Sequence, residues 1–272
     1  MPYSATEELK KVRDYYAGDP LQKRFSALIT GETNAGKTFL LRTARRPIHI
    51  DSFDPGGTKC LRDLIASGDV IADTRWEADD PYEPKVFANW MKAVDLRFHI
   101  DYYSQFGTYC IDSATTFGEA VMNYQLGNKS RAGETPQMRQ DYMPQKTYMT
   151  NYIRKLMNLP CDFILTGHLR ELRKVLSIDA KTGIVHEDVK YRFYTTGQAV
   201  ITIPLLFDEL YTIIGEEGRE GPKRIMLIDS LGTYIARSRL KAKGLLNAEE
   251  EPNLKALLRK AGFSTDDKPK LN

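Results

Sequence analysis

The stretch "ITGETNAGKTFLL", residues 29–41, contains residue types whose spacing suits the binding of a triphosphate. Gly31 is followed, after four residues, by Gly36, Lys37 and Thr38, which is the spacing of a phosphate-binding loop. Glycines there let backbone N–H groups approach the phosphates, while Lys37 would reach the β- and γ-phosphates and the Thr38 hydroxyl would bind magnesium. We therefore predict that the chain binds a nucleoside triphosphate with Mg²⁺. The nucleotide-binding residues expected from the motif are Gly31, Glu32, Thr33, Asn34, Ala35, Gly36, Lys37, Thr38 and Phe39.

A second carboxylate is needed to hold the metal, usually at the end of a neighbouring strand. Asp112 in "YCIDSATTF" follows a short apolar run, so we expect Thr38 and Asp112 to be the metal ligands. Asp112 could instead cap the helix that "ATTFGEA" predicts. Ser113 follows it, where many P-loop motors have a catalytic Glu. The carboxylate that activates water must therefore come from elsewhere in the chain.

The elements that must position these residues alternate between short apolar runs and segments with helical spacing. The alternation favours an α/β fold with a mainly parallel sheet flanked by helices. Residues 171–194 alternate on both sides of "DAKTG", which predicts a β-hairpin. Two late strands, "ELYTIIG" and "RIMLID", are joined by a Gly-rich turn. We expect these antiparallel strands and the hairpin at one edge of the sheet.

Composition narrows the class of protein. The 272 residues carry a net charge of +3, and 42% of them are hydrophobic, which is ample for a buried core. No apolar run approaches the roughly 18 residues of a membrane span, and the first residues lack the apolar region of a signal peptide. The three cysteines stand far apart, which argues against a disulfide framework or a zinc site. We expect a cytoplasmic protein with no membrane partner.

Several stretches resemble a known family. "CIDSATTF" resembles the Asp-Ser strand end of RecA-like ATPases, and "FILTGHLR" resembles their later strand, which ends in a residue that senses the γ-phosphate. "PLLFDELY", with "ARSR" after a late strand, is similar to the phage branch of these proteins. The resemblance spans roughly residues 25–240. We expect a RecA-like P-loop NTPase core at 21–243, a helical segment at 1–20, and a helix with a mobile tail at 244–272.

The resemblance also implies where the catalytic residues lie. The base of the family is normally a Glu at the end of the second strand, but this sequence has Phe53 there. The nearest carboxylates are Asp54 and Asp51. Asp54 is the first candidate, although Asp is also favoured at the start of a turn such as "DPGG". His168 occupies the sensor position and joins Lys37 in the expected catalytic set. A short or displaced base predicts slow hydrolysis.

RecA-like proteins bind DNA through two loops, which correspond here to residues 127–140 and 170–196. The second contains Tyr191, Phe193 and Tyr194 among its cations, and cations beside aromatic rings are typical of single-strand binding. The alternative is an ordinary half-exposed sheet, in which nearby acids dilute the positive charge. The basic residues expected to contact DNA are Lys129, Arg131, Arg139, Arg170, Arg173, Lys174, Lys181, Lys190 and Arg192.

Arg237 and Arg239 resemble the paired basic residues that RecA-like subunits offer to the ATP of a neighbour. Such an Arg in trans stabilises charge that develops on the γ-phosphate. The resemblance therefore implies that both residues bind nucleotide and that the chain associates with itself into a filament or ring. The alternative is that both are solvated surface residues.

Three functions compete on these grounds. The first is an ATPase, slow and stimulated by DNA, that acts on single-stranded DNA in phage recombination or annealing in the host cytoplasm. The second is a DNA packaging or helicase-type motor, which would normally have a Glu directly after Asp112. The third is a nucleotide-dependent assembly or regulatory factor with weak hydrolysis, which the absence of Glu at 53 and 113 keeps open. The first best fits the resemblance.

Overall fold

The computed structural model describes residues 4–137, 139–178, 185–195, 199–218, 221–241 and 244–271. The described chain folds around a ten-stranded sheet with the order β10-β8-β7-β1-β5-β4-β2-β3, in which β6 pairs with β5 and β9 with β7. The strands are β1 Ser26–Gly31, β2 Ile48–Ser52, β3 Val70–Asp73, β4 Thr108–Asp112, β5 Asp162–Ile178, β6 Val185–Phe193, β7 Glu209–Gly218, β8 Gly221–Leu227, β9 Arg237–Ser238 and β10 Glu249–Glu250.

The six neighbouring strands from β7 to β3 are all parallel to one another, whereas β8, β9 and β10 pair antiparallel at the β7 edge. The α/β fold class and the antiparallel edge expected from the sequence are therefore confirmed. Strand β1 is buried at all six positions. A strand inside a parallel sheet is buried on both sides because helices cover both faces of such a sheet.

Helices cover the sheet on two sides. Helices α4, α5, α6 and α7 contribute to one apolar core with the β4 and β5 side chains Tyr109 and Leu165, and α2, α3 and α8 contribute to the other with Ile50 and Ile164. The helices are α1 Ala5–Gly18, α2 Lys37–Leu40, α3 Arg62–Ala66, α4 Val86–His99, α5 Ala114–Asn128, α6 Tyr142–Leu156, α7 Ala199–Thr202 and α8 Leu254–Lys260. Among the described residues, none of these helices is long and apolar enough to cross a membrane.

The register of the parallel strands brings distant segments to one edge. Gly31 at the end of β1 lies opposite His168 in β5, and Ser52 at the end of β2 lies opposite Asp112 at the end of β4. Ligands of open α/β sheets bind outside the carboxyl ends of the strands. The fold therefore places the phosphate loop, Asp112 and His168 around one edge.

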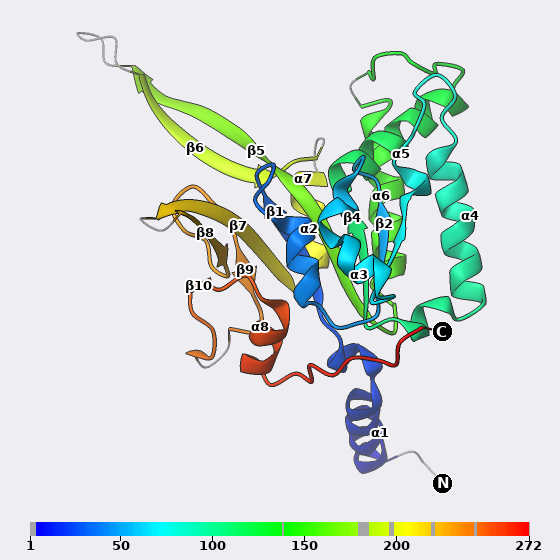
Figure 1. The fold of residues 1–272 in the computed structure, drawn as a ribbon, viewed down its shortest axis with the longest axis vertical. Coiled ribbons are helices and arrows are strands. Elements are labelled where there is room, and N and C mark those ends of the chain that lie inside the picture. Colours follow the sequence, from blue (N-terminus) through cyan, green and yellow to red (C-terminus); the bar gives the residue numbers. More distant parts are fainter. Residues whose placement is uncertain are drawn as a thin grey trace.

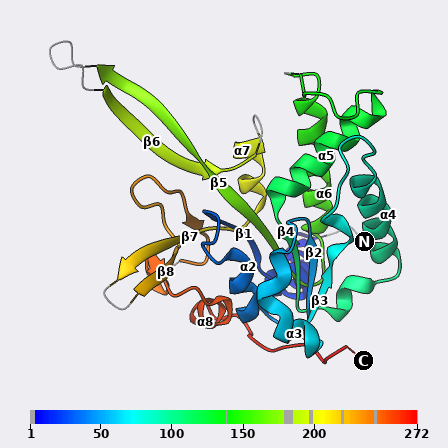
Figure 2. The same cartoon turned by 45° about the horizontal axis from the view of Figure 1, so that its top comes forward.

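The β-hairpin differs in position from the expectation. It is formed by β5 and β6, and β5 is a central strand of the sheet between β1 and β4 rather than an edge strand. Beyond His168, β5 leaves the sheet and pairs from Leu169 with Phe193 of β6. Figures 1 and 2 show the hairpin as a long projection away from the body of the molecule. Alternating residues predict the pairing but carry no information on where the paired strands leave the sheet.

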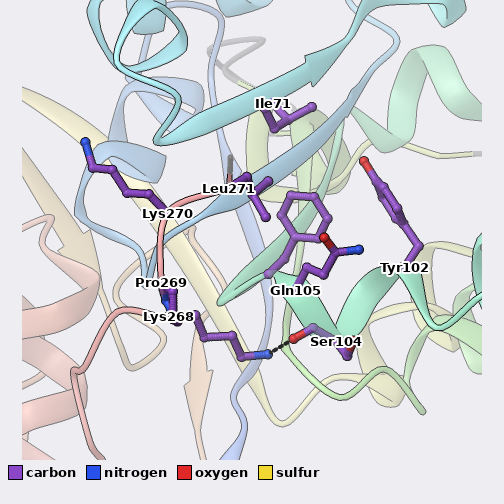
Figure 3. A pocket seen from close by; sticks show the side chains of 9 residues that line it. Ile71, Tyr102, Ser104, Gln105, Lys268, Pro269, Lys270 and Leu271 are labelled. Carbon is purple, nitrogen blue, oxygen red and sulfur yellow. Dashed lines mark hydrogen bonds between the residues drawn. The ribbon is translucent and has the colours of Figure 1, made fainter.

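The C-terminal segment contacts the core, and the mobility expected for this tail stays a prediction. Lys268 donates from its backbone N–H to the Arg46 carbonyl and from Nζ to the Ser104 carbonyl, and Lys270 lies 3.3 Å from a carboxylate oxygen of Asp69. Ser104, Lys268 and Lys270 line a pocket together with Tyr102 (Figure 3). The pocket lies at the amino ends of the strands, away from the phosphate loop.

Helix α1, unlike the C-terminal segment, does not pack against the core. Ser4 and Glu7 form a capping box at its start, but none of its residues is buried. Figure 1 shows it extending from the body beyond the amino end of β1.

Candidate nucleotide-binding site

The phosphate loop connects β1 to α2, and the Lys37 side chain folds back onto the backbone of the loop. Lys37 Nζ donates to the carbonyl oxygens of Gly31 at 3.1 Å and Glu32 at 2.8 Å. Burial lowers the pKa of Lys37, while the nearby carboxylates Asp112 and Asp54 oppose this effect. Because both of these bonds are to neutral carbonyls, phosphate oxygens can replace them with stronger charge-assisted bonds.

Thr38 and Asp112 place two oxygen atoms that could bind a metal beside the loop. The Thr38 hydroxyl donates to Asp112 Oδ2 at 2.6 Å, and Thr166 donates to Asp112 Oδ1. Burial raises the pKa of Asp112, and the bonds from Thr166 and Thr38 counter the rise. An Mg²⁺ ion prefers such oxygen ligands and would favour the ionised carboxylate. The residues present therefore fit the metal that a bound triphosphate would bring.

Asp54 points to the same cavity and is held by three donors. Its Oδ1 accepts from Ser113 Oγ at 2.9 Å and from Thr116 Oγ1, and its Oδ2 lies 3.5 Å from His168 Nε2. Burial raises the pKa of Asp54, but the hydrogen bonds from His168, Thr116 and Ser113 outweigh it, so the pKa lies below its ordinary value. Phe53, where the family pattern has Glu, is buried against Trp90 and Phe117.

His168 links the phosphate loop to Asp54. Its Nδ1 lies 3.5 Å from Lys37 Nζ and its Nε2 lies 3.5 Å from Asp54 Oδ2. Both distances are at the long limit of hydrogen bonding, so the ring is placed between the two groups without being locked to either. Three residues chosen from sequence for catalysis, Lys37, Asp54 and His168, therefore lie together.

The cavity around these groups has a volume of about 650 Å³, in the range of pockets that hold small ligands. Its lining comes from the phosphate loop and the start of α2, from the turn and short 3-10 helix after β2, from the end of β4 and from His168 within β5, with one side chain from β8. The lining residues are Thr33, Asn34, Gly36, Lys37, Thr38, Phe39, Asp54, Pro55, Gly56, Gly57, Lys59, Cys60, Asp112, His168 and Arg224.

The arginine from β8 is a residue that the sequence did not single out. The Arg224 guanidinium lies against Gly36, where an added Cβ would be 3.1 Å from it, and Arg224 Nη2 donates weakly to the Asn34 carbonyl at 3.4 Å. Gly36 has φ of +96°, a conformation that favours glycine. The close packing of the Arg224 guanidinium on the phosphate loop thus depends on a glycine at position 36. Arg224 supplies a cation over the phosphate loop from the same chain.

Comparison with known proteins agrees with this geometry. A model of the family described as AAA domain matches residues 23–240, about four fifths of the chain. The chain belongs to the AAA domain family. No curated protein matches it. Among solved structures, a KaiC-like protein from the hyperthermophilic archaeon Pyrococcus horikoshii OT3 is similar, with 11% identity over 75% of this chain and 77% of that chain and a TM-score of 0.38.

As an AAA domain with a complete phosphate loop, the chain is a P-loop ATPase. Asp51, the second candidate for its catalytic base, is not in the cavity. Asp51 is fully buried and accepts hydrogen bonds from Trp76, Trp90 and Arg97, with His49 and Tyr109 also in contact. Its oxygens are occupied by protein donors, so it is not placed to activate a water. His49, Asp51 and Asp73 are close enough together for a metal ion, but Arg97 bonds to both carboxylates.

The two arginines expected to reach a neighbouring ATP do not line the cavity of their own AAA domain. Strand β9 pairs with the first two residues of β7, at the opposite end of the sheet from Lys37. Arg237 Nη2 donates to the carbonyls of Pro204 and Phe207. Arg239 is exposed and pairs with Asp208. Neither lines the nucleotide cavity of its own chain, and their role towards a neighbour stays a prediction.

In the first expected DNA loop, two cations are turned inward. Asp141, fully buried, accepts from Lys129 Nζ at 2.7 Å and Arg131 Nη1 at 2.8 Å. The Lys129 and Arg131 contacts lower the pKa of Asp141 together with the Gln137 backbone bond. These two cations hold the loop in shape, whereas Arg139 is exposed and has no side-chain partner among the described residues.

The hairpin carries both paired and unpaired cations. Arg173 pairs with Glu171 and Glu187, and Lys190 pairs with Asp188. Arg170 and Lys174 are exposed and without an ion pair in the described part of the chain. Of the two remaining residues predicted to contact DNA, Arg192 donates a hydrogen bond to the Tyr191 carbonyl. Lys181 lies outside the described residues.

We expect the Arg224→Ala variant to bind ATP roughly 10- to 100-fold more weakly than the wild type. A hydrogen bond to a charged group is worth about 1.5–3 kcal/mol, and each 1.4 kcal/mol changes affinity about tenfold. The measurement is a calorimetric titration with Mg–ATP and with Mg–ADP. Lys223→Ala, also exposed and next to Arg224 on β8 but facing the other way, is the matched control. Equal affinities for the Arg224→Ala and Lys223→Ala variants would show that Arg224 does not contact nucleotide.

Proposed function

We propose that this AAA domain hydrolyses ATP with Mg²⁺ and acts on single-stranded DNA in phage recombination or annealing. One observation supports the coupling of the two activities. Strand β5 carries His168 at the nucleotide cavity and continues without a break into the projecting hairpin. A change in what His168 contacts is therefore transmitted to the hairpin through the backbone of a single strand.

The residues of the cavity have distinct roles in this proposal. On nucleotide binding, Lys37 exchanges the carbonyls of Gly31 and Glu32 for phosphate oxygens, and Thr38 with Asp112 holds the metal. Asp54, kept ionised by its three donors, accepts a proton from the attacking water as a general base. His168 lies between Lys37 and Asp54 and so responds to whether a γ-phosphate is present.

The hairpin offers the features of a single-strand contact. Arg170 and Lys174 supply exposed cations, and Tyr194 is 41% exposed near the base of β6. Phosphates are held by such cations and bases stack on such rings. The paired charges on the hairpin favour a second candidate, a nucleotide-dependent assembly factor, because Glu171, Glu187 and Asp188 suit a protein partner as well as DNA.

Self-association belongs to the same proposal. Arg239, exposed at the end of the molecule opposite the nucleotide cavity, is available to the ATP of a neighbouring copy in a filament or ring. Its only ion pair among the described residues is with Asp208, which is half exposed, so solvent screening keeps this pair weak.

The proposal predicts a specific salt dependence of DNA binding. In the presence of a non-hydrolysable ATP analogue, Arg170→Gln and Lys174→Gln should each weaken binding of a fluorescent single strand. Each should also reduce the slope of log affinity against log salt by about 0.7, the value for one lost phosphate contact. Lys92→Gln, an exposed lysine on α4, is the matched control and should change neither quantity.

Two results would decide against this function. If the wild type with bound analogue does not bind single strands, the assembly factor becomes the leading candidate. If DNA binds but the hairpin variants have the wild-type slope, the hairpin is not the contact surface.

A further inference from the structure

The turn after β2, residues 53–57, carries Asp54 and is held on one side by β4. The backbone N–H groups of Phe53 and Asp54 donate to the Asp112 carbonyl at 2.6 and 3.2 Å. Further along, Gly56 has φ of +69°, a left-handed conformation in which the chain reverses. The bonds to β4 fix the start of the turn, so its far end depends on another partner.

Glu77 holds the other side of this turn. It follows the short 3-10 helix after β3, and its carboxylate reaches across to the segment that follows β2. Glu77 Oε1 accepts from Ser52 Oγ at 2.7 Å, and Oε2 accepts from the Gly56 backbone N–H at 2.9 Å. Ser52 and Gly56 lie on either side of Asp54 in the sequence, so one carboxylate bridges the two ends of the turn.

The backbone of Glu77 is itself fixed by the core. The preceding residue, Trp76, is buried, and its indole Nε1–H donates to Asp51 Oδ1 at 3.1 Å. The Glu77 backbone N–H donates to the Thr74 carbonyl at 3.2 Å, which closes the 3-10 turn. A group whose own supports are locked by packing and hydrogen bonds can hold a neighbouring site precisely. The buried Asp51 therefore supports the turn through Trp76 and Glu77.

We propose that Glu77 is a positioning residue for Asp54, because it holds the turn that keeps the Asp54 carboxylate in the nucleotide cavity and within 3.5 Å of His168 Nε2. The inference rests on the role of Asp54 as general base in the proposed function. Glu77 is not among the described residues that line the cavity, so it acts through the turn. A displacement of about 1 Å in a reacting group can slow a reaction about 100-fold.

Two substitutions of Glu77 separate positioning from direct chemistry. Glu77→Ala removes both acceptors, so ATP turnover should fall about 10- to 100-fold. The affinity for Mg–ATP should stay at the wild-type value, because Lys37 and Thr38 are untouched. Glu77→Gln can keep both bonds, since its oxygen accepts from the Gly56 N–H and its amide donates to Ser52 Oγ. Glu77→Gln should therefore retain most of the wild-type turnover. Steady-state phosphate release and calorimetric titration measure the two quantities.

A double variant gives a result that a general loss of structure would not give. If Glu77 acts only through Asp54, Glu77→Ala combined with Asp54→Asn should be no slower than Asp54→Asn alone, because residues that act as one unit are not additive. Urea denaturation checks that each variant is folded. If Glu77→Ala does not fold, Ser52→Ala, which removes one donor to Glu77, takes its place with a smaller expected loss. Glu83→Ala, an exposed glutamate in the following loop, is the matched control and should change neither turnover nor affinity.

Contrary outcomes fall into separate classes. Wild-type turnover in Glu77→Ala, or effects of Glu77→Ala and Asp54→Asn that multiply in the double variant, would overturn the inference. Equal losses in Glu77→Ala and Glu77→Gln would overturn it in favour of a direct catalytic role for the Glu77 charge. Wild-type turnover in Asp54→Asn would reject both the inference and the base assigned in the proposed function. A slow Asp54→Asn beside an unaffected Glu77→Ala would reject the inference alone.

Discussion

The Asp54→Asn variant should hydrolyse ATP about 10²- to 10⁴-fold more slowly than the wild type, the range that a general base contributes. The amide cannot accept the proton of the attacking water, but its oxygen can still accept from Ser113 and Thr116, so the turn keeps its shape. ATP affinity should be unchanged or higher, because one negative charge near the triphosphate is removed. Steady-state phosphate release and calorimetric binding measure the two quantities.

The pH dependence of the wild type gives an independent check. Because the pKa of Asp54 lies below its ordinary value, the carboxylate stays ionised as the pH falls through the usual aspartate range, near 3.9. Turnover limited by this base should therefore decline only below that range. Ser113→Ala, which removes one donor to Asp54, should shift the decline to higher pH. An Asp54→Asn variant with wild-type turnover would exclude Asp54 as the base.

The second large effect concerns stability rather than catalysis. Asp51→Asn should lower the free energy of unfolding by about 3–5 kcal/mol, because it leaves the buried Arg97 without its main counter-charge. Urea denaturation measures the change. The matched control is Asp95→Asn, which breaks the exposed pair with Lys155 and should cost less than about 1 kcal/mol.

The sign of the pH effect follows from the shift at Asp51. Burial alone would raise its pKa, but His49 and Arg97 outweigh burial and hold the pKa well below its ordinary value. A carboxylate with a depressed folded pKa stabilises the protein at neutral pH, and this contribution is lost as the pH falls below about 4. The stability difference between wild type and Asp51→Asn should thus shrink in acid. A variant that stays fully stable but loses turnover would make Asp51 the base after all.

The contrast between Asp51 and Asp54 shows which part of the site could be predicted from the sequence and which could not. Both carboxylates lie near the end of the second strand, so the resemblance could not separate them. In the structure, Asp51 shares a strand face with His49 and meets Arg97 of α4, while Asp54 follows in the turn and meets Ser113 and His168. The choice depends on Arg97 for Asp51 and on Ser113 and His168 for Asp54, which lie 46, 59 and 114 residues away along the chain, and no local pattern encodes them.

Local motifs were sufficient to place the phosphate loop and Asp112 at strand ends beside each other, because the residue types and the strand-end signal lie in the same few residues. Arg224 was not found, since it comes from an antiparallel strand and reaches the loop only through tertiary packing. Lys129 and Arg131 were predicted as DNA contacts because the resemblance places a DNA-binding loop at 127–140, but their counter-charge, Asp141, lies just beyond that loop. The alternation of 171–194 predicts the hairpin, but its projection follows from the extension of β5 past the sheet.

ATP turnover by the wild-type protein, with and without single-stranded DNA, tests the central claim most directly. Lys37→Ala, which removes the phosphate-binding lysine, is the background. We predict slow turnover without DNA, clear stimulation by single strands, and neither activity in Lys37→Ala. Turnover that single strands do not change would contradict the proposed link through β5 between the nucleotide cavity and the hairpin, and equal turnover in Lys37→Ala would contradict the site itself.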